Sequence, residues 1–442
     1  MATFTPKNHF KPLTSLRFFA AMHVLAFHNH LDALMDFPGG IRSIIRTGYV
    51  SVSLFFVLSG FILAYTYHGG RENVPFNRRS FWIARLARIY PVYLVGLLLA
   101  APFVFWAHFN SDRPAWSAFK ILVLGGSCGT LTQSWVPPLA VEWNAPGWSL
   151  SAEAFFYLIF PFVSPWIWRW NQRQTVMALA GLWLLSLCLP TLCCCAGVAG
   201  FSDCPATVAP STGWLAKLVA YNPLLRFPEF LLGIALCRLF VLKRQSRLTT
   251  ASSDRLIITG RHHKSSFDNE LKQEATEGTE NIETLFFLRC LRCLLFLFSL
   301  AKKHFLPAIA LIGIVGVLGC GGWIPYPFLH NGLLDILFAV LIYGLANVDS
   351  GSGLAKTPAR LLSMPIFVLL GEASYAVYIL HVPLRKWMYQ ILEWVNPNVH
   401  PSMVIFVAYT LITLGVSVLV FKLIEEPARR IIRRRLAYTS PL

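Results

Sequence analysis

Long apolar segments alternate with short polar connections along most of the chain. A helix needs about 20 mostly apolar residues to cross a hydrocarbon core of roughly 30 Å, where its backbone must satisfy its own hydrogen bonds. The pattern therefore predicts an all-α polytopic membrane protein with about ten transmembrane helices. We place them at Leu13–Leu34, Gly48–Tyr67, Pro91–Phe109, Trp148–Trp168, Thr175–Cys195, Asn222–Leu242, His304–Gly322, Leu329–Asn347, Met364–Leu384 and Ser402–Ile424.

The basic residues between these segments predict the orientation of the chain. Lys and Arg near span ends concentrate on the cytoplasmic side of a membrane. They follow the second, fourth, sixth and tenth segments, at 71–88, 169–173, 243–247 and 429–435. Ten spans then place both termini in the cytoplasm. We expect a multi-pass protein of the cell membrane, plasma or inner, with the first span retained because it is too long for a signal peptide.

Two stretches do not fit the simple alternation. The segment from Arg244 to Asn281 is polar and lacks a hydrophobic period, which predicts a poorly ordered cytoplasmic loop. Leu285 to Leu300 is apolar but contains Arg289 and Arg292, which favours an interfacial amphipathic helix over an eleventh span. We therefore predict a membrane domain over 1–427, interrupted by a cytoplasmic loop at 243–303, and a basic cytoplasmic tail at 428–442.

The segment between the third and fourth spans is also irregular. Trp116 to Val136 is apolar in places, but glycines interrupt it and Pro137 and Pro138 follow. This pattern suits a short helix or a re-entrant element on the outer side.

Composition excludes an ordinary soluble domain. Hydrophobic residues make up 55% of the 442 residues, charged residues make up 13%, and the mean hydropathy is +0.56. The formal charge of +17 does not indicate a nucleic-acid partner, because the basic residues lie between the spans and at the C-terminus. The ten cysteines form no paired CxxC modules, so we expect no metal site.

Ionisable residues inside the first span are the first candidates for chemistry. Such groups cost several kcal/mol at membrane depth unless they are paired or hydrated. Arg17 and His28 are three helical turns apart, on nearly one face and about 16 Å from each other. A histidine can take a proton from a hydroxyl near neutral pH and later return it. The alternatives are a snorkelling arginine and a structural, hydrogen-bonded histidine.

Two further groups lie toward the outer ends of their spans. Glu153 follows one turn into the fourth span, at a depth comparable to that of His28, where its carboxylate could orient the imidazole. Its alternative is a role at the helix N-terminus. His381 is a second catalytic candidate, although His381 and Pro383 could simply shape the end of the ninth span.

Other charged residues are candidates for binding. Arg85 and Arg88 lie three residues apart at the cytoplasmic mouth of the third span, where planar guanidinium groups could clamp the phosphates of coenzyme A. Taken alone, basic residues beside a span are more often topology signals. Glu229, beside Pro228 at the start of the sixth span, could line an acceptor entrance or cap the helix.

These residues together resemble the acyltransferase 3 family of membrane acyltransferases, in order and over nearly the whole chain. The resemblance rests on six stretches: Leu13–Ala20 leading to His28, Gly48–Phe61, Phe81–Pro91, Trp148–Tyr157, Arg226–Gly233, and Gly371–Pro383 with the closing Glu425-Glu426-Pro427. Ser51 and Ser53 stand where the family often has Gly and an acid, and Ala154 stands where a second Glu often follows.

The resemblance implies an integral membrane O-acyltransferase. Such proteins take an acyl group, commonly acetyl, from cytoplasmic acyl-CoA as co-substrate and pass it to a hydroxyl of an outward-facing glycan, lipid-linked sugar or other acceptor, with membrane lipids around them and no tightly bound cofactor. We expect the membrane domain to work alone or with a separate partner. A multispan transporter of a small metabolite or sugar is the alternative, although the spans show no inverted repeat.

The resemblance and the predicted topology together assign roles to the candidate residues. His28 is expected to be the general base or the acyl-accepting group, with Glu153 as its partner. Arg17 is expected to contact the donor or a carboxylate, and Arg85 and Arg88 to contact coenzyme A.

Overall fold

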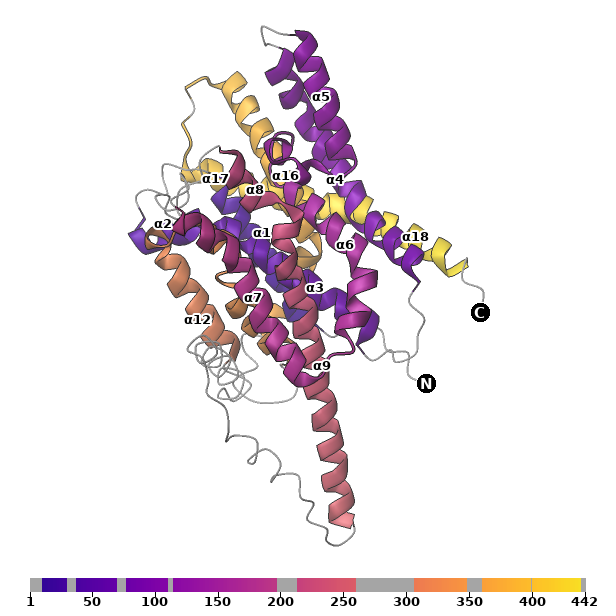
Figure 1. Cartoon of the computed structure of the whole chain (residues 1–442). Helices are drawn as coiled ribbons and strands as arrows, with labels where there is room; N and C mark the ends of the chain where they lie inside the picture. Colours follow the sequence, from indigo (N-terminus) through magenta and orange to yellow (C-terminus); the bar gives the residue numbers. More distant parts are fainter. Residues whose placement is uncertain are drawn as a thin grey trace.

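The computed structural model describes residues 10–29, 37–69, 77–109, 114–196, 213–259, 306–347, 360–398 and 400–438. Helices account for nearly all the regular structure in these ranges, and no strand occurs in them. The principal helices are α1 (Lys11–Phe27), α2 (Gly39–Arg46), α3 (Ser51–His68), α4 (Arg78–Phe109), α5 (Pro114–Gly129), α6 (Gly147–Ile167), α7 (Gln172–Cys195), α8 (Trp214–Tyr221), α9 (Pro223–Thr259), α12 (Leu306–Gly319), α13 (Tyr326–His330), α14 (Asp335–Ala346), α16 (Pro365–Val395), α17 (Met403–Val420) and α18 (Glu426–Tyr438). Figure 1 shows their arrangement.

The all-α membrane fold class is confirmed. Within the described ranges, seven helical segments are long and apolar enough to cross a membrane: Gly48–His68, Arg78–Phe109, Gly147–Ile167, Gln172–Cys195, Tyr326–Ala346, Pro365–Val395 and Met403–Ile432. The other three predicted spans coincide with α1, α9 and α12. Of these, α1 has 17 residues and α12 has 14, whereas α9 carries three charged residues in its first five turns. The count of ten and the location of the termini stay predictions.

Two helices are longer than the hydrophobic pattern predicts. α4 begins at Arg78 and passes through Pro91, so Arg85 and Arg88 lie on the same helix as the third span. α9 continues to Thr259, and the prediction of a poorly ordered loop from Arg244 is therefore wrong for its first part. No Gly or Pro occurs between Gly233 and Gly260, so nothing local ends the helix. Figure 1 shows this half of α9 projecting from the bundle. The stretch Leu285 to Leu300 lies outside the described residues.

Other segments differ in continuity. The predicted span Leu329–Asn347 is broken into α13 and α14 by a turn in which Gly332 has a φ of +98°. Only glycine adopts this conformation readily. The irregular segment after the third span contains the short helix α5, followed by 3₁₀ turns at Gln133–Trp135 and Pro137–Leu139.

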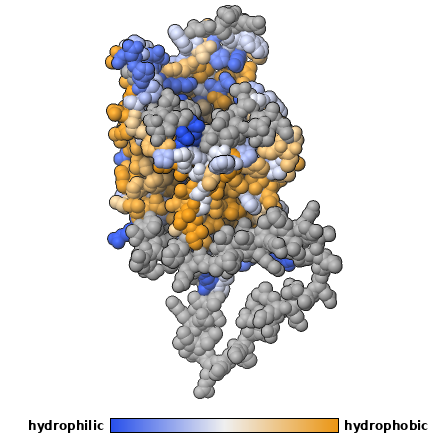
Figure 2. Space-filling model, turned by 90° about the vertical axis from the view of Figure 1, so that its left-hand side faces the viewer, coloured by the Kyte–Doolittle hydropathy of each residue, from blue (hydrophilic) through white to orange (hydrophobic). Residues whose placement is uncertain are grey.

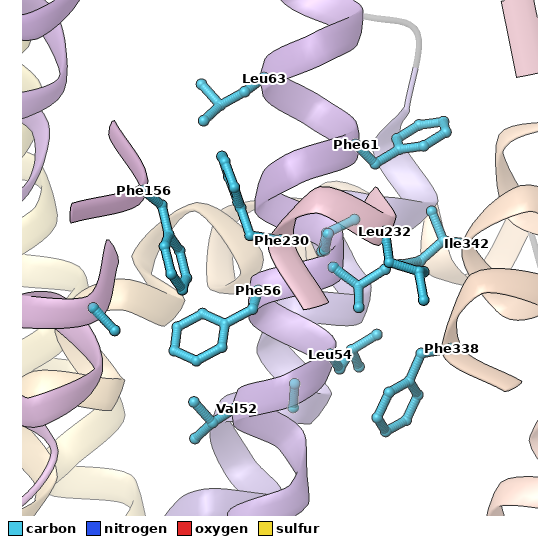
Figure 3. Close-up of a cluster of buried hydrophobic side chains, with 14 of the residues drawn as sticks. Val52, Leu54, Phe56, Phe61, Leu63, Phe156, Phe230, Leu232, Phe338 and Ile342 are labelled. Carbon is cyan, nitrogen blue, oxygen red and sulfur yellow. The ribbon is translucent and has the colours of Figure 1, made fainter. Parts of the chain in front are cut away.

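The core of the bundle lies where α3 meets α9 and α14. Figure 3 shows aliphatic and aromatic side chains of α3, including Phe56 and Phe61, beside Phe230 of α9, Phe156 of α6 and Phe338 of α14. The two central helices touch through glycines. A Cβ on Gly60 would lie 2.2 Å from the carbonyl oxygen of Phe230, and one on Gly233 would lie 2.0 Å from that of Val57. Small residues allow this approach, as is usual between membrane helices.

The outer surface of the bundle is apolar. Leu98, Trp106, Leu122, Ile312 and Val404 are each at least 65% exposed. Figure 2 shows a broad hydrophobic region across the middle of one face, with hydrophilic side chains gathered toward the top. Exposed apolar patches of this extent are rare on soluble monomers, so we infer that this surface faces lipid.

The glycine contact between α3 and α9 predicts a sharp difference between two glycine substitutions. Gly60→Val should destabilise the bundle by about 1–3 kcal/mol or more, because the new side chain meets backbone atoms that cannot move aside. Gly316→Val is the matched control, since nothing lies within 4 Å of a Cβ at Gly316 of α12. Thermal unfolding of both purified variants in detergent measures the effect. Equal melting temperatures would contradict the close contact.

Candidate functional site

A central pocket lies between α1, α3, α4, α6 and α16. Its polar lining combines Arg17 of α1, Arg88 of α4 and Glu153 of α6 with the hydroxyl groups of Ser149 and Tyr378. Its apolar lining comes largely from α3 and consists of Val52, Phe55, Phe56, Leu58, Ile62 and Leu63, with Leu150 of α6. The pocket thus has a charged region and a hydrophobic wall.

Glu153 lies among cations and hydroxyl groups. Ser59 donates a hydrogen bond to its Oε1 at 3.1 Å, and the hydroxyl of Tyr157, one turn later, donates to the same oxygen. Arg17 and Arg88 both interact electrostatically with Glu153 and with the buried Glu425. Arg17 therefore directs its guanidinium group into the interior of the bundle. A snorkelling arginine would instead direct it toward the lipid headgroups.

The two predicted catalytic histidines are brought together. His381 Nε2 lies 3.1 Å from His28 Nδ1, although the residues come from α16 and from the end of α1. His381 is fully buried, whereas His28 is partly exposed. The structure thus pairs the imidazole of His28 with that of His381. Sequence reasoning chose Glu153 as the partner, but Glu153 accepts hydrogen bonds from Ser59 and Tyr157.

Backbone carbonyls fix the proton positions in this pair. His381 Nδ1 lies 2.8 Å from the carbonyl oxygen of Tyr378 and 3.2 Å from that of Val377, so Nδ1 carries the proton that donates to them. In a neutral His381 ring, Nε2 is then an acceptor. It accepts the Nδ1 proton of His28, which also lies 3.0 Å from the carbonyl oxygen of Val24. His28 is thereby held in the tautomer whose Nε2 is basic.

Tyr378 connects the pocket with the histidine pair. Its hydroxyl lies 2.8 Å from Ser149 Oγ at the pocket wall, and its ring centre is 6.2 Å from that of His381. Sequence reasoning did not single out Tyr378 or Ser149. The signal was present in the spacing, because Tyr378 precedes His381 by three residues and shares its helical face.

Arg85 and Arg88 line a smaller cavity between α4 and α18. Arg429 of α18 supplies a third guanidinium group to it, and Arg88 lines both this cavity and the central pocket. Arg429 also forms an ion pair with Glu425 at 3.3 Å. Sequence analysis treated Arg429 only as a topology signal. Arg429 is far from Arg85 along the chain, so the sequence alone could not show that both line one cavity.

Glu229 is in a different environment from the one predicted. It is fully buried and pairs with Arg226, one turn earlier on α9, at 3.0 Å. Arg226 also donates to Ser53 Oγ at 2.9 Å, to Asn331 Oδ1 at 3.1 Å and to the carbonyl oxygen of His330. Asp335 is buried and interacts electrostatically with the same guanidinium group. This environment matches neither an exposed entrance nor a helix cap.

Comparison with known proteins bears on this arrangement. The acyltransferase domain family matches residues 12–422, which include every helix that contributes to the central pocket. The chain belongs to the acyltransferase 3 family. This membership favours an enzyme over a transporter.

Individual relatives carry names of the same kind. The chain is 32% identical over 235 residues to "Acyltransferase MdmB" of Streptomyces mycarofaciens, covering 51% of this chain and 56% of that protein. It is 23% identical over 442 residues to "Peptidoglycan O-acetyltransferase OatA" of Listeria monocytogenes, covering 96% of this chain and 56% of that protein. The chain thus spans little more than half the length of each of these two relatives. No solved structure matches it.

The buried ion pair of α9 predicts a stability effect that a substrate-binding role would not give. Arg226→Gln leaves Glu229 and Asp335 without their shared cation and should destabilise the protein by about 3–5 kcal/mol. Glu229→Gln added to Arg226→Gln should recover part of the loss. Thermal unfolding in detergent measures both.

Arg430→Gln is the matched control, because it removes the exposed pair with Glu426 and should cost at most about 1 kcal/mol. If Glu229→Gln alone left the melting temperature unchanged and only weakened substrate binding, the structural assignment of Glu229 would be wrong.

Proposed function

We propose that the chain transfers an acyl group, most simply acetyl, from acyl-CoA to a hydroxyl of a glycan or related acceptor, with donor and acceptor bound at opposite ends of the bundle. One observation carries this proposal. The central pocket extends from Arg88, which also lines the cavity of Arg85 and Arg429, to Tyr378. The ring of Tyr378 in turn lies beside His381, which pairs with His28.

Three arginines support coenzyme A as the donor. Arg85, Arg88 and Arg429 converge on one cavity from two helices. Guanidinium forks bind phosphate oxygens in pairs, and three of them match a ligand with several phosphates better than a single carboxylate. Coenzyme A carries both a pyrophosphate and a ribose phosphate.

The shape of the central pocket supports the same donor. Arg88 lines both cavities, so a ligand whose phosphates rest on Arg85 and Arg429 can extend past Arg88 into the central pocket. The apolar wall from α3 suits a long, weakly polar arm, and the pantetheine arm of coenzyme A has this character. In this arrangement Arg17 and Glu153 contact the arm beyond the phosphates.

His28 is then the general base. Its Nε2 takes the proton of the acceptor hydroxyl as the oxygen attacks the thioester carbonyl carbon. The new carbon–oxygen bond forms, the carbon–sulfur bond breaks, and the proton returns from His28 to the departing thiolate of coenzyme A. His381 does not touch the reacting atoms. It is a positioning residue that fixes the tautomer of His28 and stabilises its imidazolium form.

The name of one relative supports the acceptor class. The Listeria relative is named for O-acetylation of peptidoglycan, a glycan that lies outside the cell membrane. An outward-facing glycan or lipid-linked sugar is consistent with the orientation that the basic residues predict, in which His28 and His381 lie toward the outer side of the plasma or inner membrane.

Substitution of His28 tests the catalytic role. His28→Ala should lower kcat for acetyl transfer by about 10²–10⁴-fold while leaving acetyl-CoA binding unchanged, because His28 lines neither the central pocket nor the cavity of Arg85, Arg88 and Arg429. Acetyl transfer to an acceptor in purified membranes and acetyl-CoA binding to the same preparation provide the two readouts. A variant that retains full transfer would exclude His28 as the base.

The positioning role of His381 is tested by a pair of variants. His381→Gln keeps an acceptor oxygen for the His28 Nδ1 proton, whereas His381→Ala does not, so the Gln variant should retain the larger kcat. Equal losses in both variants would indicate that His381 is needed only for packing.

Replacement of Arg85 and Arg88 tests the donor site. The double variant Arg85→Gln, Arg88→Gln should raise KM for acetyl-CoA by about tenfold or more, because each lost charge-assisted hydrogen bond is worth about 1.5–3 kcal/mol. Acetyl-pantetheine, which lacks the nucleotide phosphates, should react equally with the variant and the native protein. Arg79→Gln, at an exposed position earlier on α4, is the matched control. An equal loss with both donors would contradict phosphate recognition.

A further inference from the structure

A second groove lies on the far side of the histidine pair from the central pocket. Its lining includes Asn29, Arg385, Lys386, Tyr389 and Glu393. Most of these residues come from the part of α16 that follows His381, and Asn29 directly follows His28. Both histidines of the pair therefore have chain neighbours in this groove.

Asn29 gives the first indication of a ligand. Its side chain is only 4% exposed, and neither its amide nitrogen nor its carbonyl oxygen has a hydrogen-bond partner among the described residues. A buried amide without hydrogen-bond partners is unfavourable, because it has lost its hydrogen bonds to water. A ligand hydroxyl satisfies such a group well, because a hydroxyl can donate to the amide oxygen and accept from the amide nitrogen.

The charges of the groove give a second, independent indication. Arg385 lies one turn after His381 on the same face of α16 and interacts electrostatically with it. Lys386 lies over the ring of Phe103, with its Nζ 5.7 Å from the ring centre. The ion pairs formed within the described ranges include neither Arg385 nor Lys386. Two cations against the single Glu393 leave the groove with an excess of positive charge.

The groove is also well separated from the cavity lined by Arg85, Arg88 and Arg429. Phe103, which lines it, follows Arg85 on α4 by about five turns, or about 27 Å along the helix axis. The groove and the proposed donor phosphates therefore occupy opposite ends of one helix. A chain of contacts links the central pocket to this groove. It runs from Tyr378 to His381, then to His28 and to its neighbour Asn29 in the groove lining.

We infer that this groove binds the acceptor, and that the acceptor is a sugar carrying an anionic group, carboxylate or phosphate, near the hydroxyl that is acylated. The inference rests on the proposed acyl transfer. Asn29 holds the sugar hydroxyl groups next to His28, and Arg385 and Lys386 bind the anionic group. Glu393, which also lines the groove, can accept a hydrogen bond from a further hydroxyl.

Binding measurements on the full chain in detergent test this inference. Titration calorimetry compares three probes that share one ring: glucose, glucuronate and glucose 6-phosphate. At least one of the two anionic sugars should bind about tenfold more tightly than glucose, and added salt should reduce the difference. Comparing glucuronate with glucose 6-phosphate distinguishes a carboxylate from a phosphate as the recognised group.

Variants locate the binding site. Arg385→Gln with Lys386→Gln should abolish the preference for the anionic sugar, and Asn29→Ala should weaken all three sugars to a similar degree. Arg173→Gln, at an exposed position in the first turn of α7, should change nothing. Acetyl-CoA binding, measured on every variant, should stay unchanged and reports that the bundle is folded.

The outcomes separate this inference from the proposed function. If native protein binds glucose as tightly as both anionic sugars, or if the double variant keeps the preference, the assignment of the groove is wrong even when acetyl transfer is intact. If native protein binds an anionic sugar at the groove but does not bind acetyl-CoA, the proposed transfer reaction fails while the groove assignment stands.

Discussion

A charge within the hydrocarbon region of a membrane must find its counter-charge or hydrogen-bond partner inside the protein, and the whole bundle is arranged around this constraint. Arg226 meets it with Glu229, Ser53, Asn331 and the carbonyl oxygen of His330. Two of these partners, Asn331 and the carbonyl oxygen of His330, lie at the break between α13 and α14. In an unbroken helix, the backbone groups there would already be hydrogen-bonded to one another. The break in the eighth predicted span is thus part of how a buried guanidinium group is accommodated.

The same cluster explains the role of Ser53. Its hydroxyl accepts a hydrogen bond from Arg226 at 2.9 Å. Glu229 and Asp335 supply the negative charge around Arg226 from other positions. The close glycine contact between α3 and α9 brings Ser53 and Arg226 within reach of each other, so packing and electrostatics depend on the same interface.

Helix α16 relates the parts of the proposed reaction to one another. Along its successive turns it presents Tyr375 and Tyr378 to the central pocket, His381 to His28, and Arg385 and Tyr389 to the groove beyond. Three sites on one rigid helix keep fixed distances from each other. In the proposed reaction, this geometry brings a donor from one end of the bundle and an acceptor from the other to a single histidine.

The sequence by itself determined the helical membrane architecture, since apolar segments of spanning length have few other stable forms. It also singled out Arg17, Arg85, Arg88, Glu153, His28 and His381 as unusual, because ionisable residues within or beside spans require an explanation. Local sequence could not determine which of them meet. His28 and His381, Arg88 and Arg429, and Arg226 and Asn331 are far apart in the chain and come together only through the packing of non-adjacent helices. The sequence could not show the surroundings of Glu229 for the same reason, because they depend on Ser53, Asp335 and the broken helix, which hydrophobic periodicity along one segment does not record.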